Sequence, residues 1–243
     1  MKATILMLAL AAAGATPAVA GAISGLCNTG VVSGCASQTP MGANKADGNF
    51  TVTLSPVGTT PFAAHTIPSN PGYYTSGGNS IGTSTASWIT TDVGTPPTET
   101  NAYGTFNYQE AITSNVNGVV TFSGSYGADN CATVAWGSTP VAVSGSGVTL
   151  GGGVANCQNN MGTFTGLTSF SFQETVVAGG TYYLDFEVGN VGYQTGLLVD
   201  CLSASGGTAP AAAPEPSSIL MSLTGFGLLG GALWRRRLAT NGA

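Results

Sequence analysis

The stretch Thr-Tyr-Tyr-Leu-Asp-Phe-Glu-Val at residues 181–188 decides the fold class, because apolar and polar side chains alternate along it. Successive side chains of an extended chain point to opposite faces. The face expected to be buried carries Tyr182, Leu184, Phe186 and Val188, and the face expected to be exposed carries Tyr183, Asp185 and Glu187. This period of two predicts a strand in an antiparallel sheet. The preceding Gly179-Gly180 pair predicts a tight hairpin turn.

Short runs of the same kind occur throughout the central chain, separated by Gly, Pro, Ser and Thr. No long stretch among them repeats apolar residues at the 3.6-residue period of a helix. Further strands are expected at residues 103–112, 119–126, 132–136, 141–144, 167–177 and 195–202, with weaker candidates at 50–54 and 87–91. Residues 56–82 are expected to form loops with at most one short strand. This pattern predicts an all-β chain folded as an antiparallel β-sandwich, a jelly roll.

The two ends of the chain depart from the strand pattern. Residues 1–20 combine Lys2, an apolar run and Ala18-Val19-Ala20, which predicts a signal peptide cleaved after Ala20. Residues 217–234 are apolar and uncharged, and a helix of this length spans roughly 27 Å at about 1.5 Å per residue. That span predicts a single C-terminal transmembrane helix. The arginines that follow it predict a cytoplasmic C-terminus.

Three features of the tail follow one another in a specific order. They are Pro214-Glu215-Pro216, the apolar span, and the cluster Arg235, Arg236 and Arg237. Together, residues 214–243 resemble the PEP-CTERM sorting signal of Gram-negative bacteria. The resemblance implies that an exosortase-type membrane transpeptidase cuts near Pro-Glu-Pro and releases or re-attaches the protein. We therefore expect an exported protein, anchored by its C-terminal helix until it is processed and then located at the cell surface or outside the cell.

The chain between the two ends divides into an exported domain, residues 21–204, and a short linker, residues 205–213. The Gly, Ala, Ser and Pro content of the linker predicts a flexible tether. Parts of the exported domain resemble the galactose-binding-like jelly roll that PEP-CTERM proteins often carry. The resemblance lies in residues 123–130, 170–180, 184–190 and 195–197. In that pattern an Asn-Gly turn follows the strand after Ala-Asp-Asn. This sequence has Trp136-Gly137-Ser138 at that place instead.

The exported domain is acidic and nearly free of basic residues. Residues 21–213 contain Lys45 against nine acidic residues, a net charge near −8. Nucleic-acid binding is excluded on this ground, because contacts to phosphate require Lys and Arg. One histidine, His65, and the absence of a Cys-x-x-Cys spacing argue against a zinc site, and we expect neither a metal nor a cofactor. Asp129-Asn130 has the oxygen atoms that calcium prefers, although an Asx turn is the preferred interpretation.

The cysteines all lie in the part of the chain that is expected outside the cytoplasm, where disulfides persist. They are Cys27, Cys35, Cys131, Cys157 and Cys201. We expect bridges between Cys27 and Cys35 and between Cys131 and Cys157, which leaves Cys201 free. Other pairings remain open, because connectivity does not follow from the sequence.

Two patterns bear on catalysis. Gly78-Asn79-Ser80-Ile81-Gly82 matches the nucleophile elbow of α/β-hydrolases, but that elbow needs a strand before it and a helix after it, and neither is predicted here. Asp185 and Glu187 project from one strand face roughly 7 Å apart, which fits the carboxylate pair of a glycosidase. Outward acids on a strand more often form a solvated face. The sequence therefore predicts that the protein is not an enzyme.

Aromatic side chains are the best candidates for contact with a neutral sugar. Trp136, Tyr73 and Tyr74 could stack on a sugar ring, whereas Trp88 is expected in the core. The leading interpretation is an exported structural or adhesive protein of the cell surface or the extracellular polysaccharide matrix. A glycan-binding module is the alternative, and a secreted hydrolase is a distant third.

Overall fold

The computed structural model describes residues 23–32, 38–56, 60–67, 69–91, 103–139, 163–190 and 194–210. All of them belong to one compact unit, Val19–Pro210. The predicted signal peptide at residues 1–20, the transmembrane helix at 217–234 and the strand at 141–144 lie outside the described residues. Within the described ranges, no helix is both long enough and apolar enough to cross a membrane.

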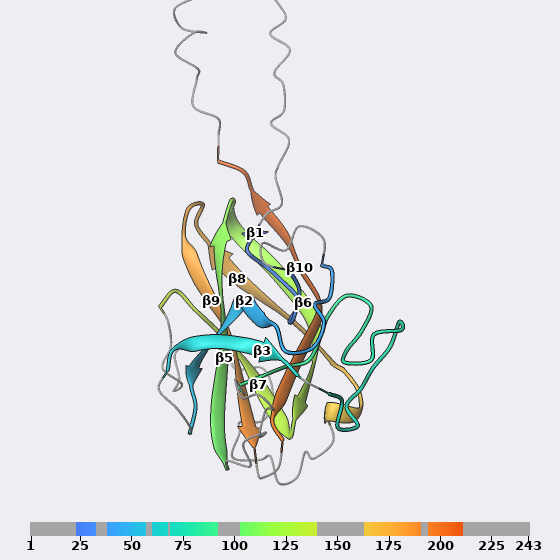
Figure 1. Cartoon of the computed structure of the whole chain (residues 1–243). Coiled ribbons are helices and arrows are strands. Elements are labelled where there is room, and N and C mark those ends of the chain that lie inside the picture. The colour runs from blue at the N-terminus through green and yellow to red at the C-terminus, as the bar shows by residue number, and fades with distance from the viewer. Residues whose placement is uncertain are drawn as a thin grey trace, which may run out of the picture. The chain divides into compact units, whose positions relative to one another are not determined.

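The described chain is built from antiparallel strands that form one curled sheet (Figure 1). The strands are β1 (Ile23–Ser24), β2 (Ala46–Leu54), β3 (Phe62–Thr66), β4 (Ile89–Thr90), β5 (Gly104–Ser114), β6 (Asn117–Asp129), β7 (Cys131–Gly137), β8 (Thr168–Val176), β9 (Thr181–Asn190) and β10 (Gly196–Thr208). Their order in the sheet is β7-β9-β5-β2-β3-β4-β10-β6-β8, and β1 pairs with β5. The predicted all-β, antiparallel class is confirmed. The two layers expected of a β-sandwich are halves of one sheet, joined through β3 and β4, and the jelly-roll topology stays a prediction.

The turn at Gly179-Gly180 does not form the hairpin that the sequence suggested. β8 pairs with β6 from Tyr126↔Thr168 to Gly118↔Val176, whereas β9 pairs with β5 over ten residues. The turn therefore carries the chain from one half of the sheet to the other. The backbone of the turn is hydrogen-bonded to the end of β5 instead. The Gly179 N–H donates to the Ser114 carbonyl over 2.7 Å. A glycine pair shows where the chain reverses but not which strands pair afterwards.

The main core lies inside the curl. Residues from both halves of the sheet meet there, namely Phe50, Val52, Phe106, Tyr108, Ile112, Val120, Phe122, Val134, Trp136, Phe170, Phe172, Tyr182, Leu184, Phe186, Val188, Leu197 and Val199. The predicted inward face of β9 is confirmed, since all four of its members are buried. The outward face departs from the prediction, because Asp185 is only 3% exposed. Alternation along a strand shows which side chains share a face, but it does not show whether another segment covers that face.

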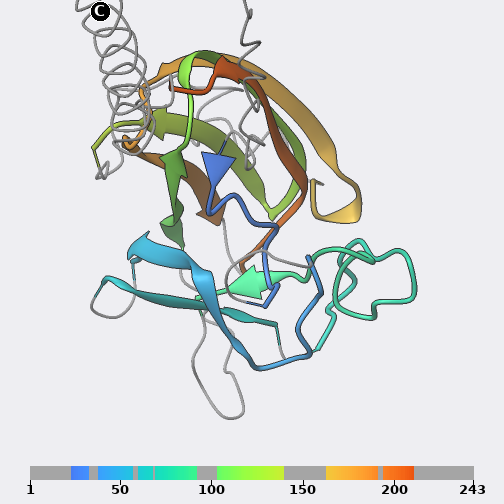
Figure 2. The ribbon, with the colours of Figure 1, turned by 90° about the horizontal axis from the view of Figure 1, so that it is seen from above.

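A second, smaller core covers the outer surface of β10. It consists of Ile67, Tyr73, Ile81, Ala86, Trp88 and Leu198. Figure 2 shows the loop that supplies most of these residues lying outside the strands. Leu198 points to this core while its neighbours Leu197 and Val199 point to the main one, which explains the unbroken apolar run. Trp88 is fully buried, as expected.

The N-terminal segment Cys27–Val31 packs between the two halves of the sheet. Its amides bond side chains and backbone around it: Cys27 N–H donates to Glu110 Oε1 over 2.6 Å and Gly30 N–H to Asp47 Oδ2 over 2.7 Å. Gly30 has a φ of +60°, and a Cβ atom there would approach the Ser87 Cβ atom to 2.6 Å. Only glycine fits both the conformation and the space.

The last strand extends further than the sequence suggested. β10 continues to Thr208 and pairs Ser205 with Thr121 and Gly206 with Val120. The first four residues of the predicted linker, 205–208, therefore belong to the sheet rather than to a tether. Their low complexity was misleading, because small residues still donate and accept the backbone hydrogen bonds of a ladder.

Candidate functional site

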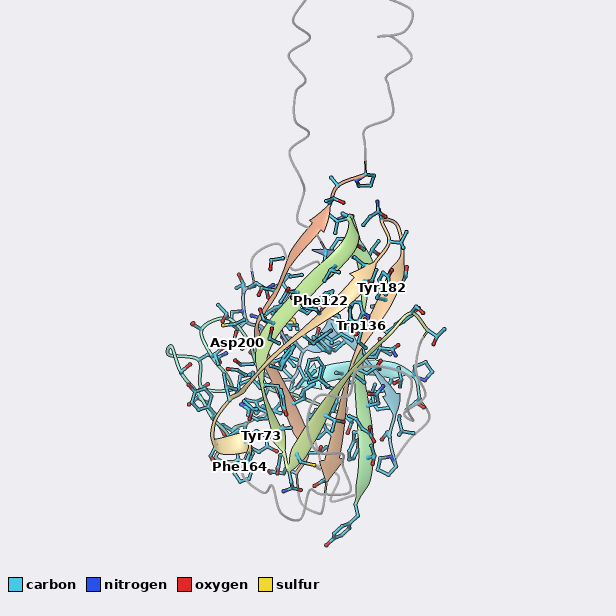
Figure 3. The ribbon with its side chains drawn as sticks, turned by 180° about the vertical axis from the view of Figure 1, so that it is seen from behind. Tyr73, Phe122, Trp136, Phe164, Tyr182 and Asp200 are labelled. Atoms are coloured by element: carbon cyan, nitrogen blue, oxygen red, sulfur yellow. The ribbon has the colours of Figure 1, made fainter. Side chains whose placement is uncertain are left out.

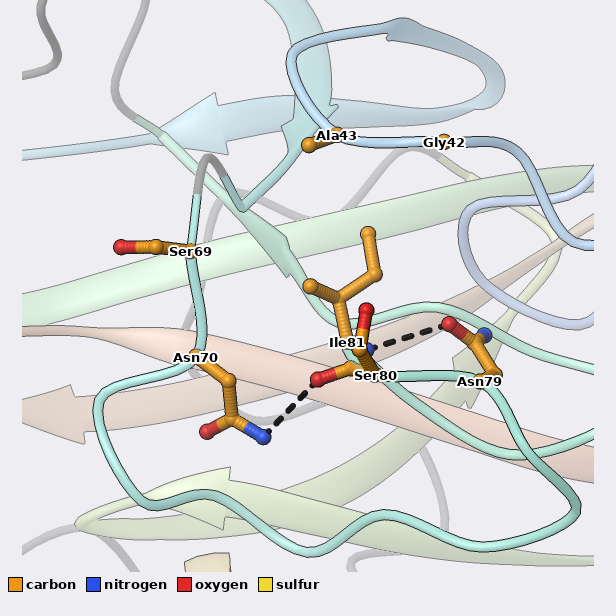
Figure 4. Close-up of a pocket in the computed structure, with 7 residues that line it drawn as sticks. All are labelled: Gly42, Ala43, Ser69, Asn70, Asn79, Ser80 and Ile81. Carbon is orange, nitrogen blue, oxygen red and sulfur yellow. Dashed lines mark hydrogen bonds between the residues drawn. The ribbon is translucent and has the colours of Figure 1, made fainter.

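A hollow of about 360 Å³ opens beside the second core (Figure 4). Its lining consists of Gly42, Ala43, Ser69, Asn70, Asn79, Ser80 and Ile81. Side-chain hydrogen bonds from two asparagines hold the loops that line it. The Asn70 amide donates to the carbonyls of Tyr73 and Ser80, each over 3.1 Å, and the Asn79 amide donates to those of Thr83 and Ala86 over 2.9 Å. The hollow has a mixed polar and apolar lining and carries no charged side chain.

The nucleophile-elbow motif lies at this hollow but lacks the geometry of an elbow. Residues 78–82 form turns and a single bridge, with no strand directly before Ser80 and no helix after it in the described chain. His65 is not part of the lining, and its Nδ1 atom lies 3.0 Å from the Ala63 carbonyl on its own strand. No base therefore adjoins the Ser80 hydroxyl among the residues that line the hollow. This arrangement can hold a small neutral polar molecule, but it shows no means of activating a serine.

The structure places Trp136 in the main core, which corrects the expectation of a sugar-stacking ring. Trp136 is 5% exposed and stacks on Tyr182 with ring centroids 5.1 Å apart and an interplanar angle of 11°. It also packs against Phe122, with ring centroids 4.4 Å apart (Figure 3), and against Phe172 at 5.9 Å. A sugar cannot reach a ring that protein atoms cover on both sides.

Tyr73 is also buried, and Tyr74 keeps partial exposure. Tyr73 packs on Trp88 at 4.4 Å and on Phe164 at 6.0 Å. Tyr74 packs against the second core, and its carbonyl accepts the Trp88 indole N–H over 2.8 Å. Tyr74 is thus the only one of the three proposed glycan contacts that this structure leaves partly accessible.

The Asp129 carboxylate is occupied by the protein's own donors. Tyr73 O–H donates to Asp129 Oδ2 over 2.9 Å, and the Asn130 amide donates to Oδ1 over 2.8 Å. Burial raises the pKa of Asp129 to about 6, opposed by the hydrogen bond from Tyr73. Both carboxylate oxygens of Asp129 therefore have hydrogen-bond partners. Asp129 and Asn130 close the end of β6 and do not form an open calcium site.

A buried carboxylate pair, which was not among the predicted site residues, lies on the neighbouring strands β2 and β5. Asp47 and Glu110 are both fully buried, and the charge of Asp47 contributes to raising the pKa of Glu110. Desolvation is the largest cause of that increase, and the hydrogen bond from Cys27 N–H opposes it. A signal was present, because Glu110 follows Phe106 and Tyr108 at the inward positions of its strand. Both carboxylates accept hydrogen bonds from backbone N–H groups, and this role is structural.

Two of the predicted disulfide cysteines fall within the described chain. Cys27 and Cys131 are disulfide-bonded, and Cys201 is a free, exposed thiol. Cys35 and Cys157 lie outside the described residues, so the pairing stays a prediction. Burial and the neighbouring Asp200 carboxylate raise the pKa of Cys201, which disfavours its reactive thiolate form.

Peptide mapping of the oxidised protein is expected to recover Cys27 linked to Cys35 and Cys131 linked to Cys157. Alkylation before reduction should label Cys201 alone, because it is exposed and unbonded. The same digest after reduction is the control, in which all five cysteines should be labelled. A peptide that joins Cys27 to Cys131 would contradict this assignment.

The tail that was predicted from its motif lies outside the described residues, and the comparison with known families bears on it. No curated protein matches the chain. Residues 212–237 match a family described as the PEP-CTERM protein-sorting motif. The matched segment contains Pro214, Glu215 and Pro216 as well as Arg235, Arg236 and Arg237. The chain therefore carries a PEP-CTERM sorting motif at its C-terminal end, which supports its export and its sorting by an exosortase.

Proposed function

We propose that the protein is a non-enzymatic structural or adhesive component of the cell surface or the extracellular polysaccharide matrix. The observation that carries the proposal is the sorting motif at residues 212–237. An exosortase-type transpeptidase is its processing partner. The tail anchors the protein in the membrane until cleavage, and the β-rich domain is the part delivered outside the cell.

The composition of the domain supports this role. Charged residues make up 6% of the whole chain, and Ser, Thr and Asn supply most of the polar side chains. Such a domain interacts through hydrogen bonds and backbone contacts rather than through charge. In the described ranges, no three His, Cys, Asp or Glu side chains lie close enough together to hold a metal ion. The residues that line the hollow beside Ser80 include no base. A passive role in a neutral matrix fits these features.

Glycan binding is a second candidate, favoured by the hollow beside the second core. Its lining presents the hydroxyls of Ser69 and Ser80 beside apolar Ala43 and Ile81. Neutral sugars combine hydroxyl groups with apolar ring faces, so this mixed lining suits them. Affinity would be low, because the hollow contains no aromatic ring for stacking.

Replacement of Arg235, Arg236 and Arg237 by Ser is expected to leave unprocessed protein that is mis-sorted. The three charges hold the C-terminal end of the span at the cytoplasmic side, and their removal weakens that orientation. Fractionation of cells followed by immunoblotting measures both the size and the location of the protein. We expect the processed form to fall by tenfold or more.

The matched control replaces the same three residues by Lys, which retains the charges. This variant should be oriented like the wild type, so its processing separates charge from recognition of the guanidinium group. Equal processing of the wild type and the Ser variant would contradict sorting through the tail. Failure of processing in both variants would show that the transpeptidase reads arginine itself.

A further inference from the structure

The outer face of the part of the sheet formed by β10, β6 and β8 carries rows of uncharged polar side chains. We call these side chains the polar rows. Cross-strand pairing aligns Ser203, Ser123 and Ser171 in one row and Ser205, Thr121 and Gln173 in the next, with Ser125 opposite Ser169 beside them. The three strands are neighbours in the sheet (Figure 1). Their inward positions carry Phe122, Phe170 and Phe172 of the main core, so one side of this region is apolar and the other is polar.

The polar rows are open to solvent and regularly spaced. All of their members on β8 and β10 are exposed, and those on the central strand β6 are half-buried between them. The register of β6 with β8 runs without a shift from Tyr126↔Thr168 to Gly118↔Val176. Neighbouring side chains in this lattice are about 4.8 Å apart across the strands and about 6.7 Å apart along them. The surface therefore suits a long partner better than a compact one.

Hydrogen bonds between neighbouring strands fix these side chains and leave part of their bonding capacity free. The bonded pairs are Ser123 with Ser203 at 2.9 Å, Ser125 with Ser169 at 3.2 Å, and the Gln173 amide donating to Thr121 Oγ1 at 3.2 Å. A serine hydroxyl has one donor and two acceptor positions, so a bonded pair of serines still offers one donor and three acceptor positions. The polar rows thus present ordered donors and acceptors to a partner.

No side chain of the polar rows is charged, although the exported domain has a net charge near −8. Two acids on the same strands face elsewhere. Asp200, opposite Ser125, is 5% exposed, and its Oδ1 atom accepts from the Asn28 amide and the Thr85 hydroxyl. Glu174 lies at an inward position of β8, on the other side of the sheet. An anionic polymer is repelled by the domain and finds no cation in the rows, so the partner that fits them is neutral.

We propose that the polar rows bind an extended, neutral polysaccharide, with the hydroxyl groups of successive sugars hydrogen-bonded to the side chains. This inference rests on the proposed function, which places the domain in a polysaccharide matrix, and it names the surface and the kind of polymer. Sugar hydroxyls both donate and accept hydrogen bonds, as the side chains of the rows do. One such contact competes with water and adds little, so the affinity comes from many contacts along one chain.

The polar rows and the hollow beside the second core suit different ligands. The hollow measures about 360 Å³ and takes a small molecule. The rows extend over three strands, and a disaccharide covers too few of their hydroxyls to be retained. Dependence on polymer length therefore distinguishes the two surfaces.

The test is retention of the purified full chain, in detergent solution, on particles of cellulose, mannan and galactan, with alginate as an anionic comparison. At least one neutral polymer should retain the protein, and retention should persist in about 1 M sodium chloride, because salt screens contacts between charges. The corresponding free disaccharide should not release the bound protein. Release by the disaccharide, retention on none of the three neutral polymers, or equal retention on alginate would overturn the proposal.

Matched double variants locate the binding surface. Ser123→Ala with Ser171→Ala removes two adjacent hydroxyls of one row and should lower the affinity about fivefold or more. Ser76→Ala with Ser84→Ala replaces two exposed serines outside the rows and should leave retention unchanged. Ser123→Thr with Ser171→Thr keeps both hydroxyls and should restore retention. Equal retention by the wild type and the Ser123→Ala/Ser171→Ala variant would overturn the proposal.

A second row variant makes the test independent of how well the first one folds. Gln173→Ala with Ser205→Ala changes two exposed side chains at the ends of the next row, and it should also lower the affinity. If Ser69→Ala with Ser80→Ala abolished retention while both row variants kept it, the polysaccharide would bind in the hollow and the inference would be wrong.

The same variants in cells separate this inference from the proposed function. The row variants have an intact tail, so they should be processed like the wild type, and a smaller fraction of them should stay with the cell-associated polysaccharide. Normal processing with unchanged retention in both row variants would overturn the role of the polar rows alone. The proposed function fails separately, if the wild type is neither processed nor exported.

Discussion

Trp136→Ala is expected to destabilise the protein by about 3–5 kcal/mol, the range for removal of a large aromatic side chain from a packed core. The indole stacks on Tyr182 at 5.1 Å and packs against Phe122 and Phe172 at 4.4 and 5.9 Å. It connects β7 and β9 with β6 and β8, so its loss opens a cavity between the two halves of the sheet. Urea unfolding followed by tyrosine fluorescence and circular dichroism measures the change.

Tyr103→Ala is the matched control, because Tyr103 is an aromatic residue that is 74% exposed. Its stability should stay within about 0.5 kcal/mol of the wild type. If Trp136→Ala lowered the free energy of unfolding by less than about 1 kcal/mol and abolished retention on a neutral glycan, the ring would be a surface platform after all. Trp136→Phe should recover part of the stability, because it retains the stacking on Tyr182.

The inward position of Trp136 follows from the sequence. Trp136 lies two and four residues after Val134 and Ala132, and all three point into the core. The period of two therefore predicts an inward side chain for Trp136. Tyr73 carried no such signal. Its burial depends on a loop closing over Leu198, a residue more than a hundred positions away.

Local and long-range information account for the difference between what was predicted and what was not. The strands of the second half that the structure describes follow from alternation, and their bounds lie within three residues of the expected ones except at the end of β10, which continues to Thr208. The sorting motif is linear, so it can be recognised without any fold. Strand pairing and the covering of an outer face depend on contacts between distant segments. Alternation alone therefore predicts a solvated acid at Asp185, and it does not predict the pairing partners of β8 and β9.

Glu110→Gln is expected to stabilise the protein at neutral pH, even though it alters a fully buried side chain. Gln retains the oxygen that accepts the Cys27 N–H, and it has the shape and neutrality of protonated Glu110. Glu110 Oε2 has no hydrogen-bond partner, so the substitution breaks no bond of that atom. We expect a higher free energy of unfolding at pH 7, because the variant removes the cost of holding Glu110 in a buried place that disfavours its charged form. Glu174→Gln on β8 controls for the loss of one acidic residue.

The pH dependence gives the sharper test of the same substitution. Because the pKa of Glu110 is raised well above its usual 4.5 in the folded state, the native protein binds a proton that the unfolded chain releases. The contribution of Glu110 to stability is therefore fully present below pH 4.5 and is lost as the pH rises through the folded pKa. The Gln variant should match the wild type at pH 4 and exceed it progressively at higher pH. A residual slope should remain, since burial also raises the pKa of Asp47. If the two free energies of unfolding ran parallel from pH 4 to pH 8, the pKa of Glu110 would be the same in the folded and unfolded states, and the prediction would be wrong.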